Sequence, residues 1–423
     1  MPNHSRLHIK NGRVIDPASG RDSVGDVYVS DGKISESFSK PEKTIDAKGL
    51  VVAPGFIDIA ARLREPGLEY KATLESEMSA AVAGGVTSLA CPPDTDPPLD
   101  EPGLVDMLRR RAKALTRARV YPIGALTLKL EGRALTEMAQ LAEAGCVAFS
   151  QGNAPLADNQ VLWRALQYAA TFGFPVWLRA EDAALARGGV AHDGEIATRL
   201  GLAGIPAFAE TIALASLLEL VRATRARVHV CRLSTAGAVE LVKSAKREGL
   251  PVTCDVSIHH VHLSDMDLGY FDSNCRLEPP LRSQRDRDAL SRGLAEGVID
   301  CLCSDHTPVD DDGKHKPFAE AEPGATGLEL LLPLALKWGE SRKLPLAQTL
   351  ARITSDPARV LGLSSGRLAP GAPGDVTVFD PAAALRVTPE TLKSQGKNTP
   401  FIGHELAGRV RYTIVAGQVV HEG

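Results

Sequence analysis

The run Gly55-Phe56-Ile57-Asp58-Ile59-Ala60-Ala61-Arg62-Leu63-Arg64-Glu65-Pro66-Gly67 decides how this chain is interpreted. The residues up to Ile59 are mostly apolar, which is typical of a short buried strand, and the residues after Ala61 become charged. The stretch therefore predicts a strand whose end carries polar side chains.

Seven further apolar runs follow, separated by stretches with apolar residues at helical spacing. The predicted strands are Val86–Cys91, Val120–Ala125, Cys146–Ser150, Pro175–Arg179, Arg227–Leu233, Pro251–Val256 and Val298–Ser304, and examples of the predicted helices are Asn159–Ala170, Ala209–Arg222 and Ala236–Glu248. With the strand ending at Ile59 there are eight strands, and repeated β-α units of this number indicate an α/β protein with a (β/α)8 TIM barrel. In that fold the functional residues lie at the C-terminal ends of the strands.

Both ends of the chain are β-rich. The alternating segments are Arg6–Val14, Asp26–Ile34, Gly374–Asp380 and Arg409–Glu422, with predicted turns at Asn11-Gly12, Asp31-Gly32 and Ala416-Gly417. Neither end is long enough to bury a core alone. We therefore expect one composite β-sandwich from residues 1–52 and 366–423, and a barrel over residues 53–365.

Composition restricts the possible partners. The net charge of −4 and an aromatic content of 4% argue against a nucleic-acid-binding protein. The longest apolar stretch, Leu328–Trp338, is too short to span a membrane, and Met1–Arg6 lacks the apolar core of a signal peptide. The seven cysteines contain no C-x-x-C pair, and Cys301 and Cys303 are predicted to be buried thiols. A cytoplasmic protein is expected.

Several motifs occur in an order that resembles the dihydroorotases of the cyclic amidohydrolase superfamily. Besides the opening run, they are Ala148-Phe149-Ser150, Ser234-Thr235, Ile258-His259-His260, Asn274-Cys275, Pro279-Pro280-Leu281-Arg282, Ser304-Asp305-His306, Gly324–Glu329 and the stretch from Gly396 to Gly403. The likeness extends from about Arg13 to Val419. It implies a barrel of the amidohydrolase type, in which histidines and carboxylates hold zinc and activate water.

The resemblance also places the zinc ligands of that family on particular residues of this chain. Those positions are occupied here by Ala60, Arg62, Gln151, Gly152, Arg179 and Arg232. Only Asp305 is retained, at the position of the aspartate that in relatives contacts zinc and handles a proton. An arginine has no acceptor and stays protonated, so it cannot ligate a metal. We expect no zinc and no other cofactor.

The substrate side of the site is predicted to be altered as well. Arg64 matches the arginine that would bind the substrate carboxylate in relatives. Asp94 and Glu278 stand where the resemblance expects asparagines, and both would add negative charge near the substrate. His259 belongs to a double histidine outside the metal set, for which a structural or substrate-side role is favoured over metal binding.

Two local interpretations remain open. Arg62, Arg179 and Arg232 could form a new anion site, but pairing with Asp305, Glu181 and Asp182 is favoured because buried charges need partners. The acidic segment Asp310–Lys316 could be a lid over an active barrel, although a solvated, mobile loop is at least as well supported.

The sequence therefore predicts an inactive dihydroorotase homologue. The altered ligand positions resemble a class of non-catalytic homologues in bacteria that partner aspartate transcarbamoylase in pyrimidine biosynthesis, which implies an assembly role within a homo- or hetero-oligomer. One alternative is a cyclic-amide hydrolase or related enzyme with zinc-independent chemistry, using Asp305 or a histidine as base near the arginines. Another is a small-anion-binding protein.

Overall fold

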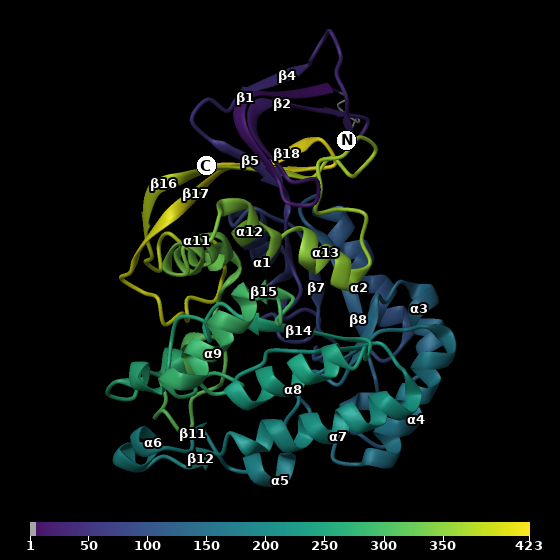
Figure 1. Cartoon of the computed structure of the whole chain (residues 1–423), viewed down its shortest axis with the longest axis vertical. Helices are drawn as coiled ribbons and strands as arrows, with labels where there is room; N and C mark the ends of the chain where they lie inside the picture. Colours follow the sequence, from purple (N-terminus) through teal and green to yellow (C-terminus); the bar gives the residue numbers. More distant parts are fainter. Residues whose placement is uncertain (1–5) are drawn as a thin grey trace.

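The computed structural model describes residues 6–423 and builds them into a barrel with a sheet beside it (Figure 1). The prediction made from Met1–Arg6 falls mainly on residues 1–5, which lie outside the described residues. Both ends of the described chain belong to the sheet, and the central part forms the barrel.

Eight parallel strands form the barrel, as predicted. In spatial order they are β6 (Phe56–Asp58), β7 (Val86–Cys91), β8 (Arg119–Ala125), β9 (Ala148–Ser150), β10 (Val176–Leu178), β13 (Val228–Val230), β14 (Val252–Ser257) and β15 (Cys301–Cys303). The gap between β6 and β15 is bridged just beyond their ends. There the Arg62 amide donates to the His306 carbonyl at 2.9 Å, and the His306 amide donates to the Ala60 carbonyl at 3.0 Å. These hydrogen bonds join the segments that follow β6 and β15 at one rim of the barrel.

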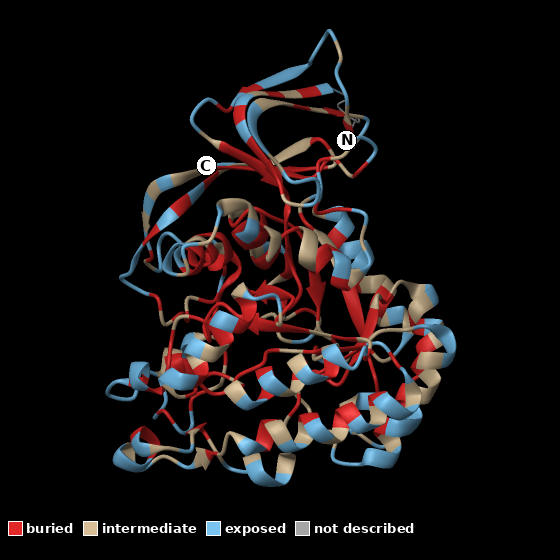
Figure 2. Ribbon diagram, in the orientation of Figure 1, coloured by how far each residue is buried: buried red, intermediate tan, exposed pale blue. Residues whose placement is uncertain are grey.

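Helices cover the barrel and expose their outer faces (Figure 2). They are α1 (Leu74–Ala83), α2 (Pro102–Ala114), α3 (Met138–Ala144), α4 (Asn159–Phe172), α5 (Ala183–Ala186), α6 (Glu195–Leu200), α7 (Phe208–Thr224), α8 (Ala236–Arg247), α9 (Gln284–Ala295), α10 (Asp311–Lys314), α11 (Leu331–Ser341), α12 (Leu346–Ala351) and α13 (Ser355–Leu361). Helix α8 is representative: Thr235 caps its first turn by accepting from the Ala238 amide, and its buried residues Val239 and Val242 lie three apart on one face.

The sheet from the chain ends is one hydrogen-bonded unit. Its order is β18 (Gln418–Glu422), β17 (Glu405–Val415), β16 (Val376–Arg386), β5 (Val51–Pro54), β1 (Arg6–Asp16), β2 (Arg21–Ser30) and β3 (Lys33–Ser35), and β4 (Lys43–Asp46) pairs with β1. A separate short pair consists of β11 (Ala191–His192) and β12 (Gly204–Ile205). In Figure 1 strands from the start of the chain (purple) and from its end (yellow) lie in this one sheet, where β5 pairs with β16.

One predicted turn in this sheet is wrong. Asn11-Gly12 does not end a strand but lies inside β1, where Asn11 has a φ of 61° and the register with β2 shifts. This is a β-bulge, which uses the same left-handed residue as a turn. The turns at Asp31-Gly32 and Ala416-Gly417 are confirmed, and each has positive φ at both residues, as tight hairpins require.

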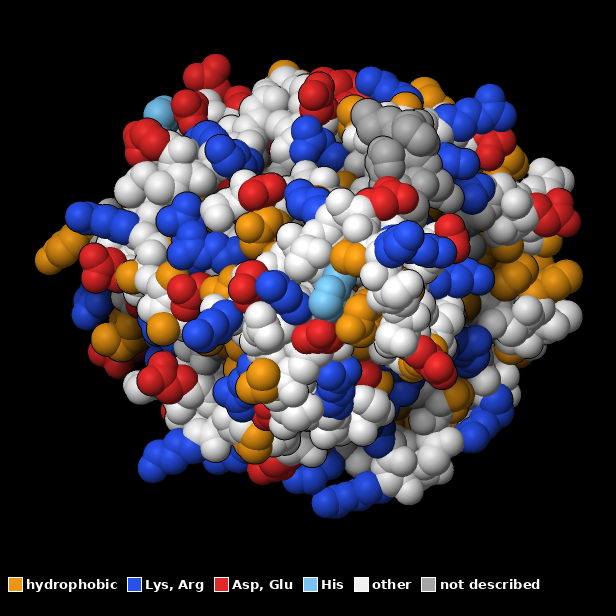
Figure 3. All heavy atoms as spheres, turned by 90° about the horizontal axis from the view of Figure 1, so that it is seen from above, with side chains coloured by type: hydrophobic (Ala, Val, Ile, Leu, Met, Phe, Trp, Pro, Cys, Tyr) orange, Lys and Arg blue, Asp and Glu red, His pale blue; other side chains and the backbone are white. Residues whose placement is uncertain are grey.

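Three apolar clusters are buried in the described part of the chain, and the largest packs the helices against the barrel strands. The barrel interior is filled by small and medium side chains with one large ring, Trp177, and includes Cys301 and Cys303, whose thiols are buried as predicted. The terminal sheet has its own core around Ile9, Val52 and Ile414. Positive and negative side chains are interspersed on the face that Figure 3 shows. None of the helices in the described part of the chain combines the length and apolar character needed to cross a bilayer.

Candidate functional site

Charged side chains from five barrel strands meet at the rim where the strands end. Arg62 follows β6, Asp94 follows β7, Arg179 follows β10, Arg232 follows β13 and Asp305 follows β15. Parallel strands place the residues after their C-terminal ends at the same rim. We call these five residues, together with Asn153 and Glu278, the strand-end cluster.

Asp305 lies between two guanidinium groups. Its Oδ1 atom accepts from Arg232 at 3.2 Å and from Arg62 at 3.5 Å. The side chains of all three are only 5–6% exposed. Burial raises the pKa of Asp305, and the charges of Arg232 and Arg62 oppose that rise. The carboxylate that the resemblance places at a catalytic position is therefore already paired with two cationic side chains.

Asn153 joins the three arginines, a role that the sequence did not reveal. Its Oδ1 atom accepts from Arg62 at 3.0 Å and from Arg232 at 2.5 Å, and its carbonyl accepts from Arg179 at 3.4 Å. Its side-chain nitrogen donates to Glu278 at 3.2 Å. The only sequence signal was its place shortly after the strand ending at Ser150.

Arg179 is balanced by two glutamates. One guanidinium nitrogen lies 2.7 Å from Glu181 Oε2, and the other donates to Glu278 Oε1 at 2.8 Å. The expected pairing with Asp182 is wrong, because the Asp182 carboxylate caps α5 by accepting from the amides of Ala184 and Leu185. Short helices take an acceptor at this position, since their first amides lack partners.

Asp94 is also held by an arginine. Its Oδ2 atom accepts from Arg62 Nε at 2.8 Å. Burial acts to raise the pKa of Asp94, but the charge and hydrogen bond of Arg62 outweigh it, and the pKa is lowered overall. The Asp94 charge predicted to face a substrate is thus directed at Arg62.

Gln151 and Gly152 complete the altered ligand positions, and neither offers a group to the cluster. The Gln151 amide turns away, accepting from Thr127 Oγ1 at 2.9 Å and donating to the Leu130 carbonyl at 2.8 Å. Gly152 lies against Asp94, and a Cβ atom there would be 3.1 Å from Asp94 Cβ. The Asp94 side chain occupies the space into which a side chain at Gly152 would extend.

Arg64 is separated from these pairs. Its Nε atom donates to the Pro308 carbonyl at 2.8 Å, and burial with the nearby charge of Arg62 lowers its pKa to about 10. Arg64, Arg232 and Asp305 all have left-handed backbones, with φ of 62°, 54° and 48°. Non-glycine residues adopt this conformation at a cost of about 1–3 kcal/mol each, and such strain is concentrated at functional sites.

The histidines singled out in the sequence do not join the cluster. His259 is fully buried, stacks on Phe401 at 5.8 Å between ring centroids, and has no hydrogen-bond partner for either ring nitrogen among the described residues. His260 contacts Ser257 Oγ at 3.0 Å and the Pro280 carbonyl at 3.2 Å. Burial lowers the pKa of His259 to about 3 and that of His260 to about 4. Both rings are neutral packing elements at neutral pH.

The acidic segment beside the rim is anchored rather than a solvated loop. Residues Asp311–Lys314 form α10, and Gly313 and Lys314 are buried. Lys314 Nζ donates to the carbonyls of Ser273 at 2.9 Å, Glu322 at 2.8 Å and Arg276 at 3.3 Å. Lys314 thus anchors α10, which the acidic composition of the segment does not predict.

The residues at the positions that the resemblance assigns to zinc ligands do not fit a divalent cation. Ala60 and Gly152 carry no donor atom, Gln151 is turned away, and the guanidinium groups of Arg62, Arg179 and Arg232 donate inward to the cluster. A cation at the centre of the cluster would lie among positive groups, and an interaction between two like charges ~4 Å apart costs ~4 kcal/mol at an effective dielectric of ~20.

A different group of potential ligands lies deeper in the barrel. His229, Cys231 and Asp255 bring a ring nitrogen, a sulfur and a carboxylate oxygen within 4.8 Å of one another. Their donors and acceptors are already used: His229 contacts Thr253 and Asp255 at 2.8 Å each, and Asp255 Oδ1 accepts from the Arg232 amide at 2.8 Å. Burial also raises the pKa of the Cys231 thiol, which disfavours the thiolate that a metal requires.

A pocket of about 460 Å³ opens beside the cluster. Its wall includes Asn153, Arg179, Glu181 and Glu278, together with residues of α4, α5 and α7. The volume is within the range of small-molecule sites. The polar groups that face it from the cluster are paired with one another.

Sequence comparisons agree with this architecture. The family described as Dihydro-orotase-like matches residues 49–238, and the Amidohydrolase family matches residues 179–420. A "Dihydroorotase-like protein" of Pseudomonas aeruginosa is 47% identical over 99% of this chain and 100% of its own length. The chain belongs to the dihydroorotase-like amidohydrolases. A "Dihydroorotase" of Geobacter sp. (strain M21) is 42% identical over 98% of this chain and 99% of its own.

Among solved structures, this dihydroorotase-like chain is similar to an L-hydantoinase (dihydropyrimidinase) from Arthrobacter aurescens. The TM-score is 0.87 at 26% identity, covering 99% of this chain and 96% of the hydantoinase. The barrel and the sheet from both chain ends thus recur together, and the predicted fold class is confirmed.

Proposed function

We propose that this dihydroorotase-like protein is a non-catalytic member of pyrimidine biosynthesis that serves as a structural partner of aspartate transcarbamoylase. The observation that carries the proposal is the mutual neutralisation of the strand-end cluster. Arg62, Arg179 and Arg232 are bound by Asp305, Asp94, Glu278 and Asn153, so each of these charged groups already has a partner among residues 6–423.

The chemistry of an amidohydrolase needs an ionised water near neutral pH, which a metal normally supplies. Here the base position, Asp305, is shared between two arginines, and its carboxylate would have to break these bonds to accept a proton from water. Removing one member of a buried ion pair costs several kcal/mol. The cluster therefore acts as a closed structural unit.

The partnership rests on retention of the whole fold. Relatives that share 42–47% identity along almost the full length are named both dihydroorotase and dihydroorotase-like protein. The class of non-catalytic homologues that this chain resembles works with aspartate transcarbamoylase. In that arrangement the outer surface of the barrel binds the partner, and the rim does not need to keep its zinc ligands.

Sedimentation velocity tests the partnership. The purified full chain is mixed at micromolar concentration with the aspartate transcarbamoylase of the same organism, and a stable hetero-oligomer is expected. A variant with Asp305→Asn, altered only at the rim, serves as a control and should assemble equally well. Two separately sedimenting species for the wild-type chain would contradict the proposal.

Measurements of activity and metal content test the second part of the proposal, which is that the chain is not a catalyst. The chain should not hydrolyse dihydroorotate with or without added zinc, and dialysed protein should contain well under one zinc per chain by mass spectrometry. Adding zinc or a chelator should leave the melting temperature unchanged, since a metal that binds the native state would raise it. Stoichiometric zinc or measurable turnover would refute the absence of catalysis.

The pocket of about 460 Å³ favours a second candidate, a zinc-independent enzyme acting on cyclic amides. Preorganised arginines can stabilise an oxyanion without a metal. This candidate requires turnover that persists in chelator and disappears in Asp305→Ala. Turnover unaffected by that substitution would remove Asp305 from the mechanism.

A further inference from the structure

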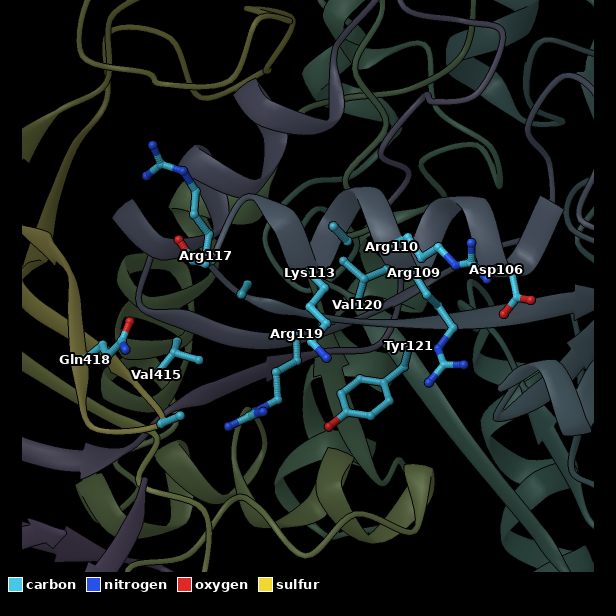
Figure 4. A pocket seen from close by; sticks show the side chains of 14 residues that line it. Asp106, Arg109, Arg110, Lys113, Arg117, Arg119, Val120, Tyr121, Val415 and Gln418 are labelled. Carbon is cyan, nitrogen blue, oxygen red and sulfur yellow. The ribbon is translucent and has the colours of Figure 1, made fainter. Parts of the chain in front are cut away.

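A second pocket lies at the opposite end of the barrel from the strand-end cluster. It has a volume of about 590 Å³ and is formed by α2, the start of β8 and the turn between β17 and β18 (Figure 4). The cluster is near the C-terminal ends of the barrel strands, whereas Arg119 is the first residue of β8. The two sites are therefore independent.

The pocket is strongly basic in a chain that is acidic overall. Five of its fourteen lining residues are cationic, namely Arg109, Arg110, Lys113, Arg117 and Arg119, and only Asp106 is acidic, whereas the whole chain has a net charge of −4. No ion pair involves Arg110, Lys113 or Arg117 within residues 6–423. These unmatched charges attract an anion and repel one another.

The wall of the pocket is fixed by a buried carboxylate. Asp375 accepts from Arg119 at 3.0 and 3.1 Å, and also from the Ala416 amide at 2.8 Å. This joins the start of β8 to the Ala416-Gly417 turn. Arg119 is thereby neutralised, and four cations remain against Asp106.

The side chains of the remaining cations point in different directions. In Figure 4, Arg109 and Lys113 extend from α2 to the same side as Arg119 and the Tyr121 hydroxyl, while Arg117 extends the other way. Arg109 is positioned by the last carbonyl of α3, that of Ala144, to which it donates at 2.6 Å. Arg109 and Lys113 thus define the centre of positive charge, and Arg117 lies at its margin.

We propose that this basic pocket binds a small polyanion that carries a chain of phosphate groups, such as a nucleoside triphosphate or an inorganic polyphosphate. A single carboxylate would leave most of the excess positive charge unmatched, whereas linked phosphates carry several charges. Guanidinium groups bind phosphate through paired donors, and lysine binds it as a point charge. The volume suits a ligand of this size.

Isothermal titration calorimetry on the full chain tests the proposal, with tripolyphosphate, ATP and inorganic phosphate as the probes. We expect saturable binding of tripolyphosphate at one site per chain in ~25 mM salt, weakening at ~150 mM because exposed charges are screened. ATP binding more tightly than tripolyphosphate would assign contacts to the nucleoside, and equal affinity would assign the site to the phosphate chain alone. Either result supports the proposal.

The double variant Arg109→Ala/Lys113→Ala should weaken tripolyphosphate binding by at least about tenfold. Arg133→Ala/Lys337→Ala removes two exposed cations outside this pocket and should bind like the wild type. Lys113→Ala alone, which breaks no bond to α3, should weaken binding measurably if the double variant does not fold.

Three results would overturn the proposal. They are absence of saturable binding to tripolyphosphate and ATP at low salt, equal weakening in the two double variants, and tighter binding of a poly-glutamate peptide than of tripolyphosphate. The last result would make the pocket a docking site for an acidic segment.

Discussion

At the scale of single residues, Asp305 controls the balance of charge at the rim. Its Oδ1 atom accepts from both Arg62 and Arg232. We expect Asp305→Ala to lower the free energy of unfolding by about 3–5 kcal/mol, because it leaves two buried guanidinium groups short of a partner. Asp305→Asn keeps an acceptor and should cost less. Urea unfolding measures both, and equal costs would show that a neutral acceptor at this position contributes nothing and that the whole loss comes from the charge.

A second residue-scale prediction concerns His259. Its ring nitrogens have no partners within the described residues, so His259→Phe removes two unsatisfied groups and keeps a ring on Phe401. We expect stability at pH 7 within ~1 kcal/mol of the wild type. His260→Phe is the matched control and should be clearly destabilising, because His260 uses both ring nitrogens.

His259 should also make the stability of the protein sensitive to acid. The pKa of His259 is about 3 in the folded chain, against an ordinary value of 6.5. Between these values the unfolded chain binds a proton that the folded chain does not, so stability falls as the pH drops below 6.5. At pH 5 this amounts to roughly 1–2 kcal/mol. His259→Phe should lose less stability between pH 7 and pH 5 than the wild type, and parallel losses would contradict the assignment.

At the scale of elements, α10 depends on one buried lysine. The pKa of Lys314 is about 7, lowered from 10.5 chiefly by burial. From pH 7 to 10.5 the unfolded chain holds a proton that the folded chain has released, so this residue adds stability as the pH rises. The stability of the wild type relative to Lys314→Met should therefore increase between pH 7 and 9, by up to ~1.4 kcal/mol per pH unit.

Denaturant unfolding at both pH values measures this effect. Lys316→Met, which alters an exposed lysine two residues away, is the control and should show no such dependence on pH. A constant difference between Lys314→Met and the wild type would mean that Lys314 stays charged in the folded chain.

The elements also show what the sequence can and cannot predict. The eight barrel strands were found because buried strands leave short apolar runs, and the helix at Asn159 because of its spacing. The sequence does not distinguish the Asn11-Gly12 bulge from a turn, because turns and bulges use the same residues. It also does not indicate that Asn153 organises the cluster, because the partners of Asn153 come from strands far apart in the chain and only the closed barrel brings them together.

At the scale of the whole molecule, the barrel and the terminal sheet share buried polar contacts. Thr377 Oγ1 donates to the Gly85 carbonyl at 2.7 Å, Thr413 Oγ1 donates to the Val82 carbonyl at 2.6 Å, and the Gly55 amide donates to the Asp375 carbonyl at 2.9 Å. Groups buried in such a junction lose their partners if either part unfolds alone. The two parts are therefore expected to unfold together.

Asp375→Ala tests this coupling, because Asp375 is buried and links Arg119 of the barrel to the turn at Ala416. We expect a loss of about 3 kcal/mol, and a single calorimetric transition that moves down by roughly 3 °C for a chain of this length. Asp22→Ala breaks the exposed pair with Arg13 in the same sheet and should change stability by less than ~1 kcal/mol. Two separate transitions, with only the one for the terminal sheet shifted by Asp375→Ala, would show instead that the sheet folds independently of the barrel.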